Sequence, residues 1–367
     1  MKKSLAALAV LGAFGASAMA ANVSLYGVVD TGLMYLQTDP AVGDDASTLS
    51  MKSGINAGSR FGLKGEEDLG NGMKVAFTLE NQFNNDDGSL KNDRLFHREA
   101  AIHLTSQYGK LSFGRMGGVG SAAGSYDLVY AIGDSFDGGD NNVFGMVASD
   151  RYDNMITYQT PKFAGLQATV QYSFKEDSVN GAGTEGKSSA NRYAGAAVTG
   201  EFGALNTVFA YEFENRVGSL TNAGVDDGHT FYLGANYDCG FATTYAMVQY
   251  FEGARSGFGV DALGIEKPFN LVKGADGFGL HLGTVVPVAG GEFTAGLYYM
   301  DGEADFLQAN LTADLQYYGA SARYVYPLSK RTSLYAGAGY GYTEAEVETY
   351  KADGSVTQAY VGLTHKF

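Results

Sequence analysis

The chain has 367 residues, with 40 acidic residues against 25 basic ones and a formal net charge of −15. This acidity argues against nucleic acid as a partner, because phosphate binding needs a basic surface. The single cysteine, Cys239, excludes an internal disulfide and a cysteine metal cluster. Glycine accounts for 52 residues, about twice the ordinary share, and the chain holds 25 Tyr and 22 Phe but no Trp.

Residues 1–20 have the features of a secretory signal peptide. Lys2 and Lys3 form a basic start, residues 4–16 are an apolar run too short to span a bilayer, and residues 18–20 form a small-residue cleavage site. An N-terminal membrane anchor is the weaker alternative, because the apolar run is short. We therefore expect an exported mature chain, residues 21–367, with 23 basic and 40 acidic residues and a net charge of −17.

Beyond the leader, apolar and polar residues alternate with a period of two. The pattern is clear in residues 74–80, 166–175 and 205–214, none of which fits helical spacing. Successive side chains of a strand point to opposite faces, so each of these segments has one apolar and one polar face. The chain is therefore predicted to be all-β.

Two kinds of connector alternate between the predicted strands. The tight connectors are residues 68–72, 108–109, 164–165, 202–203, 239–240, 289–291 and 327–330. The long ones, which are acidic or rich in Gly and Asn, are residues 38–54, 84–93, 117–150, 176–190, 215–228, 253–274, 302–312 and 344–355. Strands placed between them number about sixteen, which suits transmembrane strands of about 9–11 residues with short turns on one side.

A soluble β-sandwich also alternates, but its connectors have no systematic difference between the two ends. Here the polar faces carry Lys, Glu, Arg and Gln, and the apolar faces end in aromatic residues such as Tyr172, Phe174, Tyr211 and Phe213. Aromatic residues at both ends of an apolar band are typical of a membrane interface. Because lipid does not tolerate open sheet edges, the pattern predicts a closed antiparallel transmembrane β-barrel.

The mature chain resembles the Gram-negative general porin family along essentially its whole length. The residues that carry the resemblance are 23–30, 59–70, 113–115, 151–154 and the ending 365–367. The resemblance implies a sixteen-stranded barrel in the outer membrane, assembly as a homotrimer in contact with lipopolysaccharide, and passive diffusion of ions and small hydrophilic solutes. It also implies that the terminal Phe367 is the signal recognised by the barrel-insertion machinery.

Residues 117–149 form the longest predicted connector, and loops of this length are usually functional or disordered. The segment carries many large apolar side chains together with four Asp residues, so we expect it to fold inward onto the barrel wall. The resemblance identifies it as the third loop, which narrows the pore. In the acidic Gly-Gly turn at residues 135–140 the usual proline is absent, and Asp134 and Asp137 are our expected lumenal acids.

The family places arginines on the wall facing these acids, and the matching positions are Arg60, Arg98 and Arg151, with Arg115 a weaker match. Clustered guanidinium groups stay charged and create a transverse field in a narrow aqueous channel. Strand parity supports Arg60 and Arg151 as inward-facing, but Arg98 shares its parity with Ala100, Ile102 and Leu104. We leave open whether its strand lies at a subunit interface. We expect the local balance of these charges, rather than the total of −17, to set ion selectivity.

No enzymatic, cofactor or metal site is predicted. The string at residues 181–188 fits a phosphate-binding loop, but predicted strands flank it and no helix follows, so we interpret it as a surface loop. The five histidines lack ligand spacing, and acidic outer loops show no calcium-loop spacing. No hydrolase constellation is apparent either. The main alternative function is a substrate-specific channel for a sugar or an anion on the same barrel, and the sequence leaves the sign of ion selectivity open.

Overall fold

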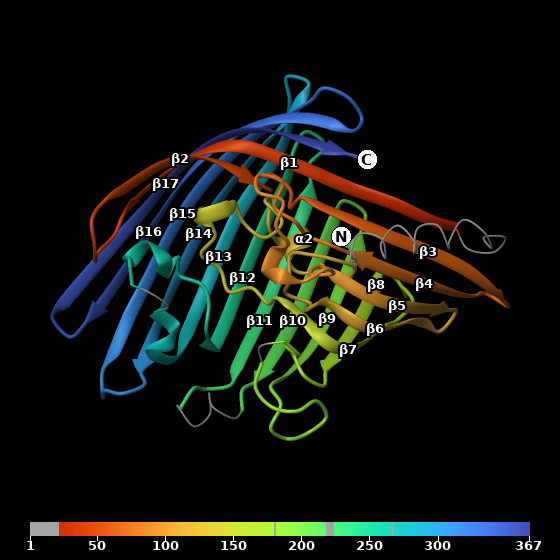
Figure 1. Ribbon diagram of the computed structural model, residues 1–367, viewed down its shortest axis with the longest axis horizontal. Helices are drawn as coiled ribbons and strands as arrows, with labels where there is room; N and C mark the ends of the chain where they lie inside the picture. Colours follow the sequence, from red (N-terminus) through yellow and green to blue (C-terminus); the bar gives the residue numbers. More distant parts are fainter. Residues whose placement is uncertain (1–21, 180, 218–223, 266–267) are drawn as a thin grey trace, which may run out of the picture.

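The computed structural model describes residues 22–179, 181–217, 224–265 and 268–367, and the predicted signal peptide therefore lies outside the described residues. Seventeen strands form one antiparallel sheet, and β1 pairs with β17 so that the sheet closes into a barrel (Figure 1). In this seam Val28 lies beside Lys366 and Asp39 beside Ser355. Closure leaves no unpaired sheet edge along this seam, as the hydrocarbon of a membrane requires.

The strands of the first half are short except for the first, which has 18 residues. Their bounds are β1 Asn22–Asp39, β2 Ala46–Ser53, β3 Arg60–Gly70, β4 Met73–Glu80, β5 Glu99–Ser106, β6 Gly109–Gly117, β7 Arg151–Gln159, β8 Leu166–Ser173 and β9 Arg192–Phe202. After β12 the strands are longer. The bounds of the second half are β10 Leu205–Asn215, β11 Gly228–Asp238, β12 Thr243–Ala254, β13 Val272–Val288, β14 Gly291–Phe306, β15 Thr312–Pro327, β16 Thr332–Val347 and β17 Tyr350–Lys366.

Two strands, β2 and β3, share one place in the wall. β2 pairs with residues 31–38 of β1 and β3 with residues 22–28 of the same strand, so the two lie end to end beside β1. The barrel therefore has sixteen strand positions, which confirms the prediction. Between β2 and β3, residues 54–59 leave the sheet.

Asp30 of β1 holds this interruption. Its buried carboxylate accepts hydrogen bonds from the Asn56 N–H at 3.2 Å, the Tyr335 hydroxyl at 2.9 Å and the Thr364 hydroxyl. Its backbone N–H donates to Ser59 Oγ at 3.0 Å. One buried carboxylate thus links β1, the 54–59 segment, β16 and β17.

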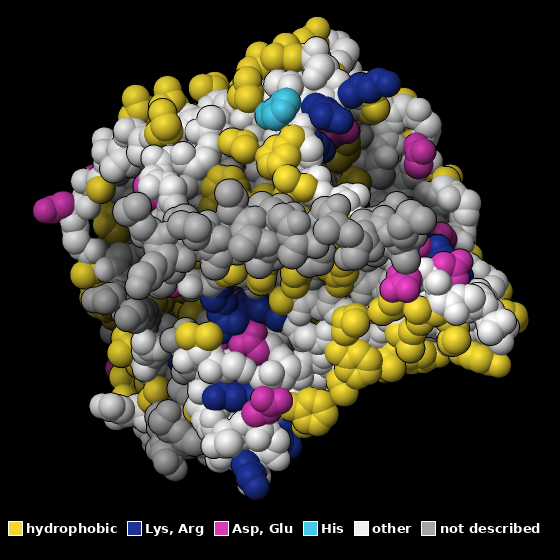
Figure 2. Space-filling view, turned by 45° about the vertical axis from the view of Figure 1, so that its right-hand side comes forward, with side chains coloured by type: hydrophobic (Ala, Val, Ile, Leu, Met, Phe, Trp, Pro, Cys, Tyr) yellow, Lys and Arg dark blue, Asp and Glu magenta, His cyan; other side chains and the backbone are white. Residues whose placement is uncertain are grey.

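The outward face of the wall is apolar and the inward face is polar. Leu233, Leu282 and Leu297 point outward and are about 60% exposed, whereas Gln249 and Gln358 point inward and are fully buried. Figure 2 shows hydrophobic side chains spread over the outer surface, with basic side chains gathered beside acidic ones in smaller groups. This orientation suits a wall between lipid and an aqueous lumen. No helix among the described residues is long and apolar enough to cross a membrane.

Aromatic rings form part of a belt around the outward face. The ring centroids of Phe278 and Tyr299 are 6.0 Å apart, and those of Tyr299 and Tyr318 are 5.2 Å apart. Two residues further along β14, Asp301 accepts a hydrogen bond from the Tyr299 hydroxyl at 2.9 Å. On β16 the Tyr342 hydroxyl likewise donates a hydrogen bond to Glu344, two residues further along the strand. The pattern of an apolar band, then a Tyr, then an acid is typical of a lipid–water boundary.

Three of the predicted long connectors are wrong. Most of residues 38–54 is strand, because the segment contains β2 and the end of β1. Much of residues 302–312 and 344–355 is strand as well, because β14 runs to Phe306 and β16 is joined to β17 by a turn at residues 348–349. Their acidic residues lie on the outward face, where Glu303 is beside Asp314 and Asp314 beside Glu346 in the register. The acidic composition of these segments predicts loops, but the sheet continues beyond the aromatic belt.

Short helices lie in the connectors. They are η1 Lys91–Asp93, α2 Tyr130–Gly133, η2 Asn141–Val143, η3 Val260–Leu263 and η4 Pro268–Asn270. The core of the molecule lies inside the barrel, where residues 118–150, here called the inner loop, pack with α2 against the wall (Figure 1). The predicted inward fold of this segment is thus observed.

Asp30→Ala should weaken the barrel. The donors of Asn56, Tyr335 and Thr364 would lose their buried acceptor, and we expect the free energy of unfolding to fall by about 3 kcal/mol or more. Thermal loss of the β-sheet circular dichroism signal in detergent measures this change. Asp30→Asn keeps one acceptor oxygen and should lose less; equal stability of Asp30→Ala and the parent chain would contradict the role given to Asp30.

Candidate functional site

The inner loop presents an apolar side to the barrel wall. Val129 and Tyr130 are fully buried, and α2 packs against β10, β11 and β12. The Tyr130 hydroxyl donates to the carbonyl of Val147 at 2.6 Å, which joins the outgoing and returning halves of the loop. The Gly118 N–H and the Asp150 carbonyl close its base at 3.0 Å. Large apolar side chains therefore hold the segment inside the lumen.

Two buried glutamates of the wall bind the first part of the inner loop. Glu212 of β10 accepts the Gly120 N–H at 2.9 Å and the hydroxyls of Tyr193 and Tyr232 at 2.6 and 2.9 Å. Glu99 of β5 accepts the N–H and hydroxyl of Ser125 at 3.0 and 2.7 Å. Since each carboxylate is surrounded by donors, its burial is compensated.

Asp134 does not take the lumenal position that we expected. Its side chain is fully buried, and it accepts the N–H groups of Phe136, Gly138 and Gly139 at 2.8–3.1 Å. The Tyr298 hydroxyl of β14 adds a fourth hydrogen bond at 2.9 Å. The Gly-Gly turn, with positive φ at both glycines, folds its amides around this carboxylate. Asp134 therefore shapes the loop.

Asp140 ties the next part of the inner loop to β17. Its carboxylate accepts the Tyr360 hydroxyl at 2.7 Å, and the Gln358 side chain donates to its carbonyl at 2.9 Å and accepts the Asn142 N–H at 3.1 Å. The loop is thus fastened to β10 on one side of the lumen and to β17 on another.

Asp137 and Asp127 are the loop acids that remain in reach of the lumen. Asp137 is exposed, with φ of 56°, and Asp127 is half-buried beside it. Burial and the neighbouring Asp137 raise the pKa of Asp127 to about 8. The two carboxyl groups therefore share a proton at neutral pH. Both interact electrostatically with Arg98, and Asp137 also with Arg60 and Arg323.

Arg60 and Arg98 lie together on the wall near these acids. Arg98 is close enough to Arg60 to interact with it electrostatically. Arg98 Nε donates to Glu80 Oε1, whereas Arg60 Nε is 3.8 Å from Glu80 Oε2. Glu80 also accepts the Tyr26 hydroxyl at 2.9 Å. One carboxylate thus serves two guanidinium groups, which leaves a local excess of positive charge.

The conflict in the parity of Arg98 has a simple cause. Arg98 precedes β5, which begins at Glu99, so the alternation of the strand does not apply to it. Glu99 and Ala101 face inward, while Ile102 faces outward with 49% exposure. Arg98 reaches the lumenal side from the connector and lies against Gly58 in the interruption between β2 and β3. No subunit interface is needed to explain it.

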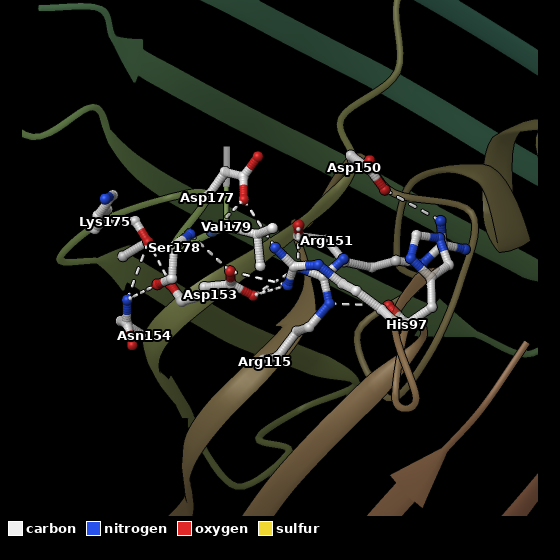
Figure 3. Close-up of polar contacts among 12 residues, drawn as sticks. His97, Arg115, Asp150, Arg151, Asp153, Asn154, Lys175, Asp177, Ser178 and Val179 are labelled. Atoms are coloured by element: carbon white, nitrogen blue, oxygen red, sulfur yellow. Dashed lines mark hydrogen bonds and ion pairs between the residues drawn. The ribbon is translucent and has the colours of Figure 1, made fainter. Parts of the chain in front are cut away.

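Arg151 begins β7, beside Arg115 of β6 (Figure 3). Arg151 makes an ion pair of 3.1 Å with Asp150, which is exposed, and its buried Nε has no partner. Arg115 is bound to Asp153 at 2.7 Å and to the carbonyls of His97 and Arg151 at 2.9 and 3.1 Å. Arg151 interacts with both Arg98 and Arg115, so the four predicted arginines form one row.

The ion-pair partners of the four arginines determine how much of their positive charge is left uncompensated. Arg94 also binds Asp153, at 2.8 Å, and Asp177 at 2.8 Å, so Asp153 is shared by two arginines. Burial and the charges of Arg151 and Arg115 lower the pKa of His97 to about 4, so His97 is neutral at pH 7. Arg115 shares its acid with Arg94, as Arg60 shares Glu80 with Arg98, and the acid paired with Arg151 is the most exposed of these partners.

Sequence reasoning missed two cations and one acid of this region. Arg323 of β15 lies over the ring of Phe136 at 4.9 Å and interacts with Asp137. Lys110 lies over the ring of Tyr126 at 4.9 Å. Arg323 shares its parity with the buried Ser321, so strand alternation could have identified it as inward-facing. Glu80 lies on the polar face of the alternating segment 74–80, so strand alternation could have identified it as inward-facing too.

No group of three metal-binding side chains occurs among the described residues. The phosphate-loop string at residues 181–188 forms turns between β8 and β9, and it precedes a strand rather than a helix. A phosphate loop needs a helix N-terminus to direct its amides. The chemistry that this site supports is electrostatic, with a row of guanidinium groups beside a proton-sharing carboxyl pair.

The chain was compared with known proteins. The model of the Gram-negative porin family matches residues 6–367. An outer membrane porin protein of Bordetella pertussis is 34% identical over 100% of both chains, and outer membrane porin protein 32 of Delftia acidovorans is 34% identical over 91% of this chain and 88% of its own. Among solved structures, the anion-selective porin from Comamonas acidovorans is 26% identical, with a TM-score of 0.66 over 95% of this chain and 100% of that one.

Glu212→Ala should loosen the inner loop without opening the wall. Gly120, Tyr193 and Tyr232 would lose their acceptor, so we expect faster amide hydrogen exchange at the start of the loop and unchanged exchange in β13–β17. Glu201→Ala, which removes an exposed acid paired with Lys162, is the matched control and should change neither. Unchanged exchange in the loop of Glu212→Ala would show that apolar packing alone holds it.

Proposed function

The chain belongs to the Gram-negative porin family, and on that premise we propose that its pore favours small anions, with the preference set by Arg60, Arg98 and Arg151. The protein is an outer-membrane porin, a β-barrel channel for ions and small hydrophilic solutes. Its relatives are porins rather than enzymes. The proposal concerns how this particular pore selects among solutes.

The observation that carries the proposal is the uneven pairing of charges at the constriction. Glu80 is the common partner of Arg60 and Arg98, and Arg151 is paired only with an exposed acid. On the acidic side, Asp134 is buried in its own turn and Asp127 shares a proton with Asp137. The local balance is therefore positive although the whole chain carries a net charge of −15.

This local excess favours anions because a narrow, water-filled path screens charge less than bulk solution does. Arg323 and Lys110 add positive charge in the same region. The printed description of the Comamonas acidovorans structure, an anion-selective porin, agrees with this sign. A guanidinium group keeps its charge when clustered, which suits a row of three.

Assembly and targeting follow the family as proposals. We propose a homotrimer in contact with outer-membrane lipid and lipopolysaccharide, a signal peptide at residues 1–20, and Phe367 as the signal for the barrel-insertion machinery. Phe367 exchanges backbone hydrogen bonds with Gly27 at 3.0 and 3.1 Å, so the terminal residue takes part in closing the barrel. Its ring lies where a side chain on Gly27 would be.

Arg60→Ala combined with Arg151→Ala should shift the reversal potential in a KCl gradient toward cations. A charge about 4 Å from a passing ion contributes about 1 kcal/mol in water, so each loss should reduce the chloride preference up to about fivefold. Planar bilayers measure this ratio directly. Arg331→Ala, at an exposed position in the turn between β15 and β16, is the control and should leave it unchanged. An unaltered ratio in the double variant would refute the assignment.

The chloride preference should fall as the pH rises from 6 to about 9. The raised pKa of Asp127, about 8, keeps a proton on the carboxyl pair below that pH, and its loss adds a negative charge beside Arg98. Asp127→Asn removes this titration and should reduce the pH dependence of the reversal potential. Asp86→Asn, an exposed loop variant with the same change in charge, should retain the parent profile. A parent channel without pH dependence would contradict the shared proton.

A further inference from the structure

A cavity of about 330 Å³ lies beyond the arginine row, on the side of the long connectors. Its wall comes from the returning end of the inner loop, from the connector after β8 and from the ends of β10 and β12. We call it the vestibule cavity. Cavities of this size hold small organic solutes. Its lining includes both acids and arginines, and the pairing among them is incomplete.

Two acids of the described lining, Glu176 and Glu212, lack an ion pair, but Glu212 is enclosed by the donors of Gly120, Tyr193 and Tyr232. None of the described basic nitrogens lies within 4 Å of the Glu176 carboxylate, although Asn191 donates a hydrogen bond to it. Glu214, on the neighbouring wall, is within electrostatic range and is itself bound to Arg216 at 2.6 Å and to the Tyr152 hydroxyl at 2.6 Å. Burial and Glu214 raise the pKa of Glu176 to about 8. A cation bound beside Glu176 would stabilise the charged form of its carboxylate.

Arg255 is the opposite case. Its guanidinium donates to the Val272 carbonyl at 3.1 Å and to Asn270 at 3.4 Å, and no described carboxylate lies within 4 Å. Glu214 is within electrostatic range of Arg255 as well as of Glu176, so the unmatched acid and the unmatched arginine flank the same ion pair. Arg151, which also lines the cavity, has a buried Nε without a partner.

The unmatched groups define the class of ligand. A simple anion would pair with Arg255 or Arg151 and leave Glu176 protonated, with Arg216 as its only described cation in electrostatic range, whereas an amine would pair with Glu176 and leave Arg255 without an acid. A solute with an ammonium and a carboxylate satisfies both, and charge-assisted hydrogen bonds of this kind are the strong ones. We propose that the vestibule cavity binds small zwitterions, with the ammonium group of an amino acid at Glu176 and its carboxylate at Arg255.

Binding in the vestibule gives the channel a specificity beyond size. A solute held beside the constriction is presented to it at a raised local concentration, and its flux saturates when the cavity is filled. This proposal rests on the proposed function, because the cavity has a transport role only if the pore conducts. It goes beyond anion preference, since a zwitterion has no net charge for the arginine row to select.

Uptake of radiolabelled L-alanine into proteoliposomes tests the proposal, with the initial rate measured over a series of concentrations. The parent channel should saturate with alanine, while lactamide, a neutral solute of similar size, should enter at a rate proportional to its concentration. Glu176→Gln and Arg255→Gln should each raise the half-saturating concentration of alanine about tenfold or more, the effect of losing one charge-assisted contact. Glu185→Gln is the control, because it makes the same chemical change at an exposed position of the same connector. This variant should behave as the parent.

Three results would overturn the proposal: alanine uptake without saturation, saturation that survives both variants, or lactate saturating as alanine does, which would make the cavity a plain anion site. Heat-modifiable electrophoretic migration confirms that each variant is folded. The reversal potential in KCl is measured on the same preparations. If the vestibule cavity does not bind zwitterions, the reversal potential in KCl still shows a chloride preference. A channel without chloride preference or conductance refutes the proposed function itself.

Discussion

The pairing of every backbone N–H and C=O within a wall that meets lipid is the constraint on which the structure depends. Water is absent from hydrocarbon, so a sheet in it must close on itself. β1 meets this demand on both of its edges, with β17 along one and with β2 and β3 along the other. Closure then divides the side chains of each strand between lipid and lumen, and this division creates the aqueous space in which the inner loop and the arginine row lie.

The inner loop shows how carboxylates are used inside such a wall. Glu212, Asp134 and Asp140 are buried, yet each is surrounded by amide or hydroxyl donors. Burial of a charge is tolerated when its hydrogen bonds are replaced in full. These acids position the loop and contribute little to the field in the lumen. The acids of the inner loop that are not enclosed in this way are Asp127 and Asp137.

Alternation and the two kinds of connector together predicted the barrel and its sixteen strand positions. Parity, which is local to a strand, also supported an inward direction for Arg60 and Arg151. It failed where residues leave the sheet or where the sheet continues unexpectedly. Arg98 lies just before β5, where parity has no meaning. Asp134 is adjacent to a Gly-Gly turn whose amides converge on its carboxylate, a tertiary detail that composition does not reveal. The acids near the ends of β14 and β16 were interpreted as loop residues because their outward neighbours could not be recognised from one strand alone.

The fastening of the inner loop to several parts of the wall has a mechanical consequence. Its hydrogen bonds reach β5, β10, β14 and β17, which are well separated around the barrel. A hollow cylinder without internal support flattens under sideways pressure, whereas one with a cross-brace resists it. The inner loop therefore braces the barrel against the lateral pressure of the surrounding bilayer, through the same hydrogen bonds that hold it inside the lumen.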